Sequence, residues 1–151
     1  MAVSNDTRHR ATEGQRERQN LAKQFDEALY PHKDLTERVI AAAIAVHKEL
    51  GPGDLEQIYE NALKIELSQR GHTVEQQVSC DVSYHGQPVG RHRLDLLVDD
   101  AVVLELKSVE VLVDTHTAQL RSTLKAARKR VGLLLNFNQK RLIDGFRRVI
   151  F

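Results

Sequence analysis

The sequence predicts an α/β protein in which a central mixed β-sheet is flanked by helices. Three observations support this fold class. Two amphipathic helical segments come first, three segments typical of strands follow, and a further helix leads to a dense apolar strand, which gives the order ααβββαβ. A helix between two strands allows them to run parallel, whereas a tight turn makes them antiparallel, so the sheet should be mixed.

The beginning of the chain differs in composition from the rest of its 151 residues. It is rich in Arg, Gln, Glu and Asn and poor in large apolar residues. Leu21, Phe25 and Leu29 keep helical spacing, so we expect a short helix over about 17–29, with disorder before it. We therefore predict a polar N-terminal extension over 1–33, partly disordered or helical, and a folded domain over 34–151.

Two helices open the folded domain. The first covers 35–50, with Thr36 or Asp34 as its N-cap. The second begins near Asp54, again a good capping residue, and ends at Gly71. Its expected core stripe consists of Leu55, Ile58, Ala62 and Ile65, with Leu63 and Leu67 widening it on one side.

Three strands are expected next, at 73–84, 91–98 and 101–108. The segment 85–90 should form the first turn, and Asp99-Asp100 the second. A third helix is expected at about 115–129. It is followed by a strand at 130–137, whose continuous apolar character is typical of burial on both faces, and by a strand or short helix at 141–151.

The composition restricts the function. With 22 Lys and Arg against 21 Asp and Glu, the net charge is +1, so nucleic-acid binding would need a local basic patch. No apolar run approaches the ~20 residues of a membrane helix, and the N-terminus lacks the apolar core of a secretory signal. Cys80 is the single cysteine, so no intramolecular disulfide forms. We expect a cytoplasmic protein without a membrane contact.

Three charged residues interrupt the apolar second and third strands. Glu105 and Lys107 are two apart and share a face, and a short hairpin would bring Asp95 beside them. Adjacent carboxylates repel each other, and Mg²⁺ prefers carboxylate and carbonyl oxygens. We predict that Asp95, Glu105 and the Leu106 carbonyl bind Mg²⁺ or Mn²⁺, and that Lys107 orients a water or stabilises phosphate charge. Alternatively, the charges form the exposed side of an edge hairpin with a weak Glu105–Lys107 ion pair.

The helices supply further candidates. Glu56 lies in the first turn of the second helix with Tyr59 on the same face, and it either adds a third carboxylate to the site or complements the helix dipole. His116, Gln119 and Thr123 share one face of the third helix. A basic flank, which either contacts phosphates or forms a solvated helix end, consists of Arg121, Lys125, Arg128, Lys129 and Arg130.

The motif Asp95…Glu105-Leu106-Lys107 resembles the D…(D/E)xK signature of the PD-(D/E)XK nuclease superfamily. The expected order of helices and strands also resembles the core of that superfamily. The resemblance extends from about Leu35 to the end of the chain and implies a restriction-endonuclease-like core.

A second motif, Gly53-x-x-Glu56-x-x-Tyr59, is similar to the one that names the GxxExxY proteins, small single-domain members of this superfamily. Gln119 matches the glutamine of the QxxxY motif in the exonuclease-like branch, which helps to hold the substrate end. Thr123 stands where that motif has Tyr, so the hydroxyl is kept but the aromatic ring is lost.

Residue patterns and resemblance together give the predicted site: catalytic Glu56, Asp95, Glu105 and Lys107; metal-binding Glu56, Asp95, Glu105 and the Leu106 carbonyl; substrate-binding Tyr59, Arg93, Gln119, Thr123 and Lys125. The first hypothesis is a Mg²⁺- or Mn²⁺-dependent nuclease that hydrolyses phosphodiester bonds of nucleic acid, with DNA the preferred expectation. The second is a catalytically silent module of the same fold that binds nucleic acid or assembles with protein. The small size favours dependence on a protein partner or a homo-oligomer, and the apolar C-terminal residues 149–151 would either pair with another subunit or complete the core.

Overall fold

The computed structural model describes residues 6–151. The chain divides into two compact units, Met1–Lys33 and Asp34–Phe151. In the described part, no helix has both the length and the apolar character that crossing a bilayer requires.

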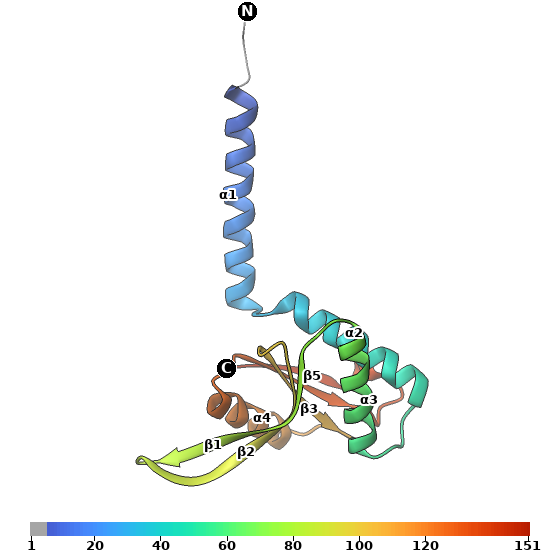
Figure 1. Ribbon diagram of the computed structural model, residues 1–151. Helices are drawn as coiled ribbons and strands as arrows, with labels where there is room; N and C mark the ends of the chain where they lie inside the picture. Colours follow the sequence, from blue (N-terminus) through green and yellow to red (C-terminus); the bar gives the residue numbers. More distant parts are fainter. Residues whose placement is uncertain (1–5) are drawn as a thin grey trace, which may run out of the picture. The chain divides into compact units, whose positions relative to one another are not determined.

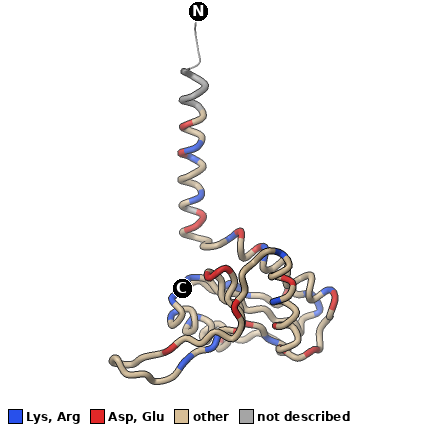
Figure 2. Tube along the Cα trace, in the orientation of Figure 1, with Lys and Arg blue, Asp and Glu red and all other residues tan. Residues whose placement is uncertain are grey.

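The first unit contains one helix, α1 (Asp6–Leu29). The expectation that ordered structure begins near residue 17 was wrong over 6–16, while residues 1–5 lie outside the described part. Blue and red segments alternate along α1 (Figure 2), as in a solvated helix. Its Arg, Gln, Glu and Ala residues have high helix propensity, so the helix needs no wide apolar stripe.

The second unit forms the predicted α/β domain (Figure 1). Its elements are α2 (Lys33–Leu50), α3 (Glu56–Gln69), β1 (Val74–Tyr84), β2 (Gln87–Val98), β3 (Val102–Lys107), α4 (Asp114–Ala127), β4 (Val131–Asn136), the 3₁₀ helix η1 (Leu142–Gly145) and β5 (Phe146–Ile150). The five strands lie in the order β1-β2-β3-β4-β5. Only β3 and β4 pair in parallel, so the mixed sheet and the order ααβββαβ are confirmed.

The sheet separates two hydrophobic clusters. On one face, α2 and α3 pack on residues such as Leu104, Leu106 and Leu133. On the other face, α4 packs on residues such as Val103 and Leu134. All six residues of β4 are buried, as its apolar run predicted. The centre of the sheet, formed by β3 and β4, is therefore covered on both faces.

The expected helix caps were wrong. Because α2 begins at Lys33, Thr36 lies inside the helix and is buried, and its Oγ1 accepts a hydrogen bond from Arg148 Nη1 at 2.6 Å. The N-cap residue of α3 is Leu55 rather than Asp54, and it makes no side-chain capping bond.

The expected core stripe of α3 was wrong on one side and right on the other, where Leu63 and Leu67 are buried and Ala62 packs against the core. Leu55, Ile58 and Ile65 are exposed. The buried stripe consists of Tyr59, Glu60, Leu63 and Leu67. Tyr59 decides the orientation, because its ring stacks on that of Phe137 with the centroids 4.6 Å apart.

The two hairpin turns are both short. The predicted turn at 85–90 reduces to His85-Gly86, with φ values of 49° and 74°, and β2 already begins at Gln87. Asp99 and Asp100 lie in the second turn as predicted, with φ values of 50° and 53°, but Val98 pairs with Val102, so this turn also includes Ala101. At His85-Gly86, positive φ at both central residues is typical of the two-residue type I′ turn, whose twist matches the flanking strands.

The C-terminal segment contains both elements that were considered for it, a 3₁₀ helix and a strand. β5 pairs with β4 on one side and forms the outer edge of the sheet. Val149 is buried in the core, whereas Ile150 and Phe151 are exposed.

Candidate active site

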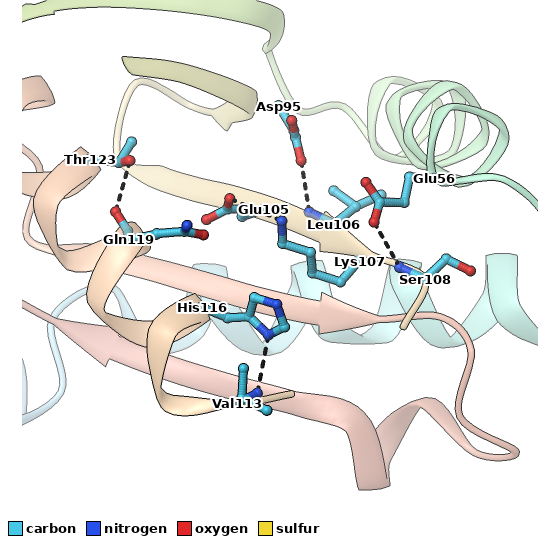
Figure 3. Close-up of polar contacts among 10 residues, drawn as sticks. All are labelled: Glu56, Asp95, Glu105, Leu106, Lys107, Ser108, Val113, His116, Gln119 and Thr123. Atoms are coloured by element: carbon cyan, nitrogen blue, oxygen red, sulfur yellow. Dashed lines mark hydrogen bonds and ion pairs between the residues drawn. The ribbon is translucent and has the colours of Figure 1, made fainter. Parts of the chain in front are cut away.

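The end of β3 carries the central part of the site. Glu105 and Lys107 lie between the apolar residues of this strand, and their side chains project on the α4 side (Figure 3). Lys107 Nζ is 3.6 Å from Glu105 Oε1, and these two side chains are 20% and 24% exposed respectively. Because β3 lies between β2 and β4, the alternative of an exposed edge hairpin does not hold.

Asp95 reaches this end of β3 from the neighbouring strand. The β2–β3 ladder ends at the pair Leu96↔Leu104. Just beyond it, the Leu106 N–H donates to Asp95 Oδ2 at 2.9 Å (Figure 3). The Asp95 carboxylate thus accepts the hydrogen bond of an N–H group that lies beyond the end of the ladder. This bond holds Asp95 beside Glu105.

The environment of Asp95 disfavours its charged form. Burial raises the pKa of this carboxyl from 3.8 to about 6. The charges of Glu60 and Glu105 also raise its pKa, while the Leu106 N–H and the Lys107 ammonium lower it. Asp95 is therefore a half-buried acid beside two other carboxylates, and a further positive charge would stabilise its ionised form.

Glu56 lies at the start of α3, beyond the end of β3. Its Oε1 accepts a hydrogen bond from the Ser108 N–H at 3.1 Å (Figure 3). Ser108 Oγ in turn donates to the Asp54 carbonyl at 2.9 Å. Two links therefore connect the N-terminus of α3 to the residue that follows β3.

Tyr59 lies in the core, although it was predicted to contact substrate. The ring is fully buried, its hydroxyl donates to the Gly51 carbonyl at 2.5 Å, and it accepts from the Asp54 N–H at 3.0 Å. Tyr59 thus fastens the loop between α2 and α3, which places Glu56.

The candidates on α4 have different environments. Gln119 is exposed and extends toward Glu105 (Figure 3). Thr123 is buried, and its Oγ1 donates to the Gln119 carbonyl at 3.0 Å, so this hydroxyl is used inside the helix. His116 Nδ1 accepts a hydrogen bond from the Val113 N–H at 3.1 Å and so closes the first turn of α4.

The basic candidates lie on β2 and α4, or directly after α4. Arg93 is exposed on β2, where it pairs with Ser79. Lys125 is exposed on α4 and lines a hollow of about 400 Å³ against β1 and β2. Lys129, from the same basic run, is bound to Asp100 with an Nζ–Oδ1 distance of 2.9 Å.

Two buried polar residues near the site were not singled out from the sequence. Glu60 is 4% exposed and close enough to Asp95 to raise its pKa. Asn136, at the end of β4, accepts from the Val109 N–H at 3.1 Å and donates to the Val109 carbonyl at 2.9 Å, which holds the segment after β3. A sequence signal exists for Glu60, because it follows Tyr59 and lies one helical turn after Glu56, on the stripe that is buried.

The donors near Asp95 suit a hard divalent cation. The Asp95 and Glu105 carboxylates and the Leu106 carbonyl are oxygen ligands of the kind that Mg²⁺ prefers. Among the residues whose side chains the structure describes, however, there is no group of three His, Cys, Asp or Glu side chains close enough to hold a metal ion. Glu56 is therefore not gathered with Asp95 and Glu105 into a three-carboxylate cluster.

Comparison with protein-family models matches residues 33–149 to the PD-(D/E)XK nuclease superfamily. The chain belongs to the PD-(D/E)XK nuclease superfamily. No curated protein and no solved structure matches it. As in the PD-(D/E)XK nuclease superfamily, a mixed sheet flanked by helices forms a restriction-endonuclease-like fold, so the predicted fold class is confirmed. Nucleases of this superfamily generally use divalent metals, which agrees with the oxygen donors beside Asp95.

Proposed function

We propose that this chain is a nuclease of the GxxExxY group that hydrolyses phosphodiester bonds of nucleic acid, with DNA as the expected substrate and Mg²⁺ or Mn²⁺ as the cofactor. One observation carries the proposal: the Asp95 carboxylate and the Glu105–Lys107 pair meet at the end of a buried strand. Charged groups in such a place are costly unless a ligand compensates them.

Asp95, Glu105 and the Leu106 carbonyl would hold the cation. When bound, a divalent cation lowers the pKa of a water and neutralises charge that develops on a phosphate. Glu56 does not form a three-ligand group with these residues. We therefore assign it to the outer part of the site, where it holds the Ser108 backbone and can orient a water.

Lys107 and Gln119 act on the substrate side. The Lys107 ammonium is partly buried and lies 3.6 Å from Glu105 Oε1, so it can stabilise negative charge on a phosphate next to the carboxylates. Gln119 is exposed and extends toward the same place (Figure 3), which suits a contact to the nucleic-acid backbone.

A second surface has the charge that a polyanion requires. Lys48, Lys140 and Arg141 line a hollow of about 360 Å³ between the end of α2 and η1, beside the buried His47. Among the described residues that line this hollow, none is acidic. Because the net charge of the whole chain is only +1, such a local patch is the means by which phosphates would be attracted.

A catalytically silent module that binds nucleic acid or assembles with protein is the second candidate function. The observations that favour it are the small size of the chain and its net charge of only +1. Such a module would bind nucleic acid equally well with and without divalent cations.

The test is a cleavage assay on single- and double-stranded DNA and RNA with Mg²⁺, Mn²⁺ or EDTA. We expect cation-dependent cleavage by the wild type and none by Glu105→Gln or Lys107→Ala. Glu75→Gln, an exposed carboxylate on β1, is the matched control and should cleave normally. Cleavage that persists in Glu105→Gln would contradict the mechanism, whereas cation-independent binding without cleavage would support the silent module.

A further inference from the structure

Glu60 is a buried carboxylate that is held by amides. It is 4% exposed, and among the described residues no Lys, Arg or His forms an ion pair with it. Its Oε2 accepts from Gln57 Nε2 at 3.0 Å and from Gln76 Nε2 at 2.6 Å, and its Oε1 accepts from Gln77 Nε2 at 2.6 Å. We call Glu60 with these three glutamines the Glu60 clasp. A buried negative charge is costly without a cation, so the clasp calls for an explanation other than stability.

The Glu60 clasp holds Gln77, the residue of β1 that lies opposite Asp95 of β2. The β1–β2 ladder pairs Gln76 with Leu96 and Val78 with Leu94, but Gln77 and Asp95 between them do not pair. Gln77 has a φ of 55°, which a residue other than glycine adopts rarely and keeps only when its surroundings impose it. The hydrogen bond from the Gln77 amide to Glu60 is the contact that can impose it.

At Asp95, the residues of strand β2 change the face of the sheet on which they lie. Leu94 belongs to the cluster under α4, whereas Leu96 belongs to the cluster under α2 and α3. Residues two apart in a regular strand would share a face. The interruption of the ladder at Asp95 therefore accompanies a twist of β2, and it leaves the Asp95 carboxylate free to reach the Leu106 N–H.

We propose that Glu60 is a positioning residue for Asp95: by holding Gln77 out of the ladder, it lets Asp95 turn toward β3 and reach the Leu106 N–H. Glu60 also lies one helical turn after Glu56, so the same clasp fixes the part of α3 that faces the end of β3. The inference deepens the proposed function and rests on it to the extent that Asp95 is a metal ligand. The alternative is that the clasp only anchors α3 to β1.

Glu60→Gln tests the positioning role without requiring any activity. This change keeps the size of the side chain but replaces one acceptor oxygen by an NH₂ group, which cannot accept from Gln77 or Gln76. We expect the exchange rate of the Leu106 amide hydrogen, measured by NMR in the absence of cations, to rise about tenfold or more, while the Leu104 amide in the ladder keeps its protection. Unchanged protection of Leu106 would overturn the proposal.

A double variant separates positioning from anchoring. Glu60→Gln combined with Gln77→Glu reverses the amide–carboxylate pair between α3 and β1 and should restore the Leu106 exchange rate to within about threefold of wild type. Glu75→Gln, on the exposed side of β1, is the matched control and should change neither amide. If Glu60→Gln instead speeds exchange at Leu104 and Leu106 alike, and the double variant does not reverse this, the clasp is only an anchor and the proposal fails.

Mn²⁺ binding measured by calorimetry connects the clasp to function. Glu60→Gln should weaken the affinity about tenfold or more, as is typical when a partner of a metal ligand is lost, and the double variant should recover most of it. If the Leu106 amide responds but the wild type binds no Mn²⁺, the proposed function fails and the positioning role stands. If the wild type binds Mn²⁺ and Glu60→Gln changes neither readout, the positioning role fails and the proposed function stands.

Discussion

Asp95→Asn should stabilise the cation-free protein at neutral pH. Burial raises the pKa of Asp95 from 3.8 to about 6, a difference of roughly 2 units at about 1.36 kcal/mol each, or about 3 kcal/mol. Because the carboxyl is only half-buried, screening by water reduces this to about 1–2 kcal/mol. Asn stays neutral, and its Oδ1 can still accept from the Leu106 N–H. The variant should therefore lose the cost of the charge and keep the hydrogen bond.

The pH dependence of the stability shows at which pH Asp95→Asn should be stabilising. Since the folded protein holds the Asp95 proton more tightly than the unfolded chain does, the contribution of this group to stability is present below about pH 4 and is lost as the pH rises through 6. The gain from Asp95→Asn should accordingly be largest at pH 7.5 and small at pH 4. Urea unfolding followed by circular dichroism in EDTA at these two pH values measures it.

The control is Asp81→Asn, an exposed carboxylate on β1 that should change stability little at either pH. Adding Mg²⁺ should reverse the order at pH 7.5, because only the wild type would bind the cation tightly. An Asp95→Asn variant that is less stable than wild type at pH 7.5 without cation would refute the reasoning, since the charge of Asp95 would then be favourable in the fold.

The remaining predictions concern the supports of the site and its basic hollow. Tyr59→Phe removes two buried hydrogen bonds and should lower the free energy of unfolding by about 1–3 kcal/mol in a urea titration; unchanged stability would show that the hydroxyl is not needed. Gly132→Ala places a Cβ 2.9 Å from the Leu120 side chain, so overpacking should cost about 1–3 kcal/mol and lower the melting temperature, and an unaltered melting temperature would contradict this. The double change Lys140→Ala with Arg141→Ala should weaken DNA binding and reduce the salt dependence of the binding constant by roughly 0.9 per lost phosphate contact; an unchanged slope in fluorescence anisotropy would remove the hollow from the binding surface.

The order of the elements could be predicted because the central strands β3 and β4 are buried on both faces. Burial makes β4 a continuous apolar run, and the short turns leave little freedom in how β1, β2 and β3 pair. The buried side of α3 could not be predicted in this way. The helix carries two apolar stripes, one through Ile58 and Ile65 and one through Leu63 and Leu67. Contacts with residues far away in the sequence, such as the stacking of Tyr59 on Phe137, select the second.

In the site, too, the features set by neighbouring residues could be predicted, and those set by distant contacts could not. The period of a strand is enough to place Glu105 and Lys107 on one side of β3, and the short hairpin brings Asp95 near them. The hydrogen bond from Leu106 to Asp95 depends on where the β2–β3 ladder stops. That detail and the burial of Glu60 arise from contacts among α3, β1 and β2 that no single motif contains.

The electrostatics and the topology of the site lead to one physical conclusion. Glu60 and Glu105 both raise the pKa of Asp95, and the Lys107 ammonium lies 3.6 Å from Glu105 and offsets only part of this charge. An apolar residue at position 60 would be enough to pack α3 on the sheet. Likewise, regular pairing of β1 and β2 would keep Asp95 in the ladder. Both departures concentrate negative charge around the end of β3 at a cost in stability. A divalent cation there would return that stability, so folding and cofactor binding should be coupled most strongly at neutral pH, where Asp95 is ionised.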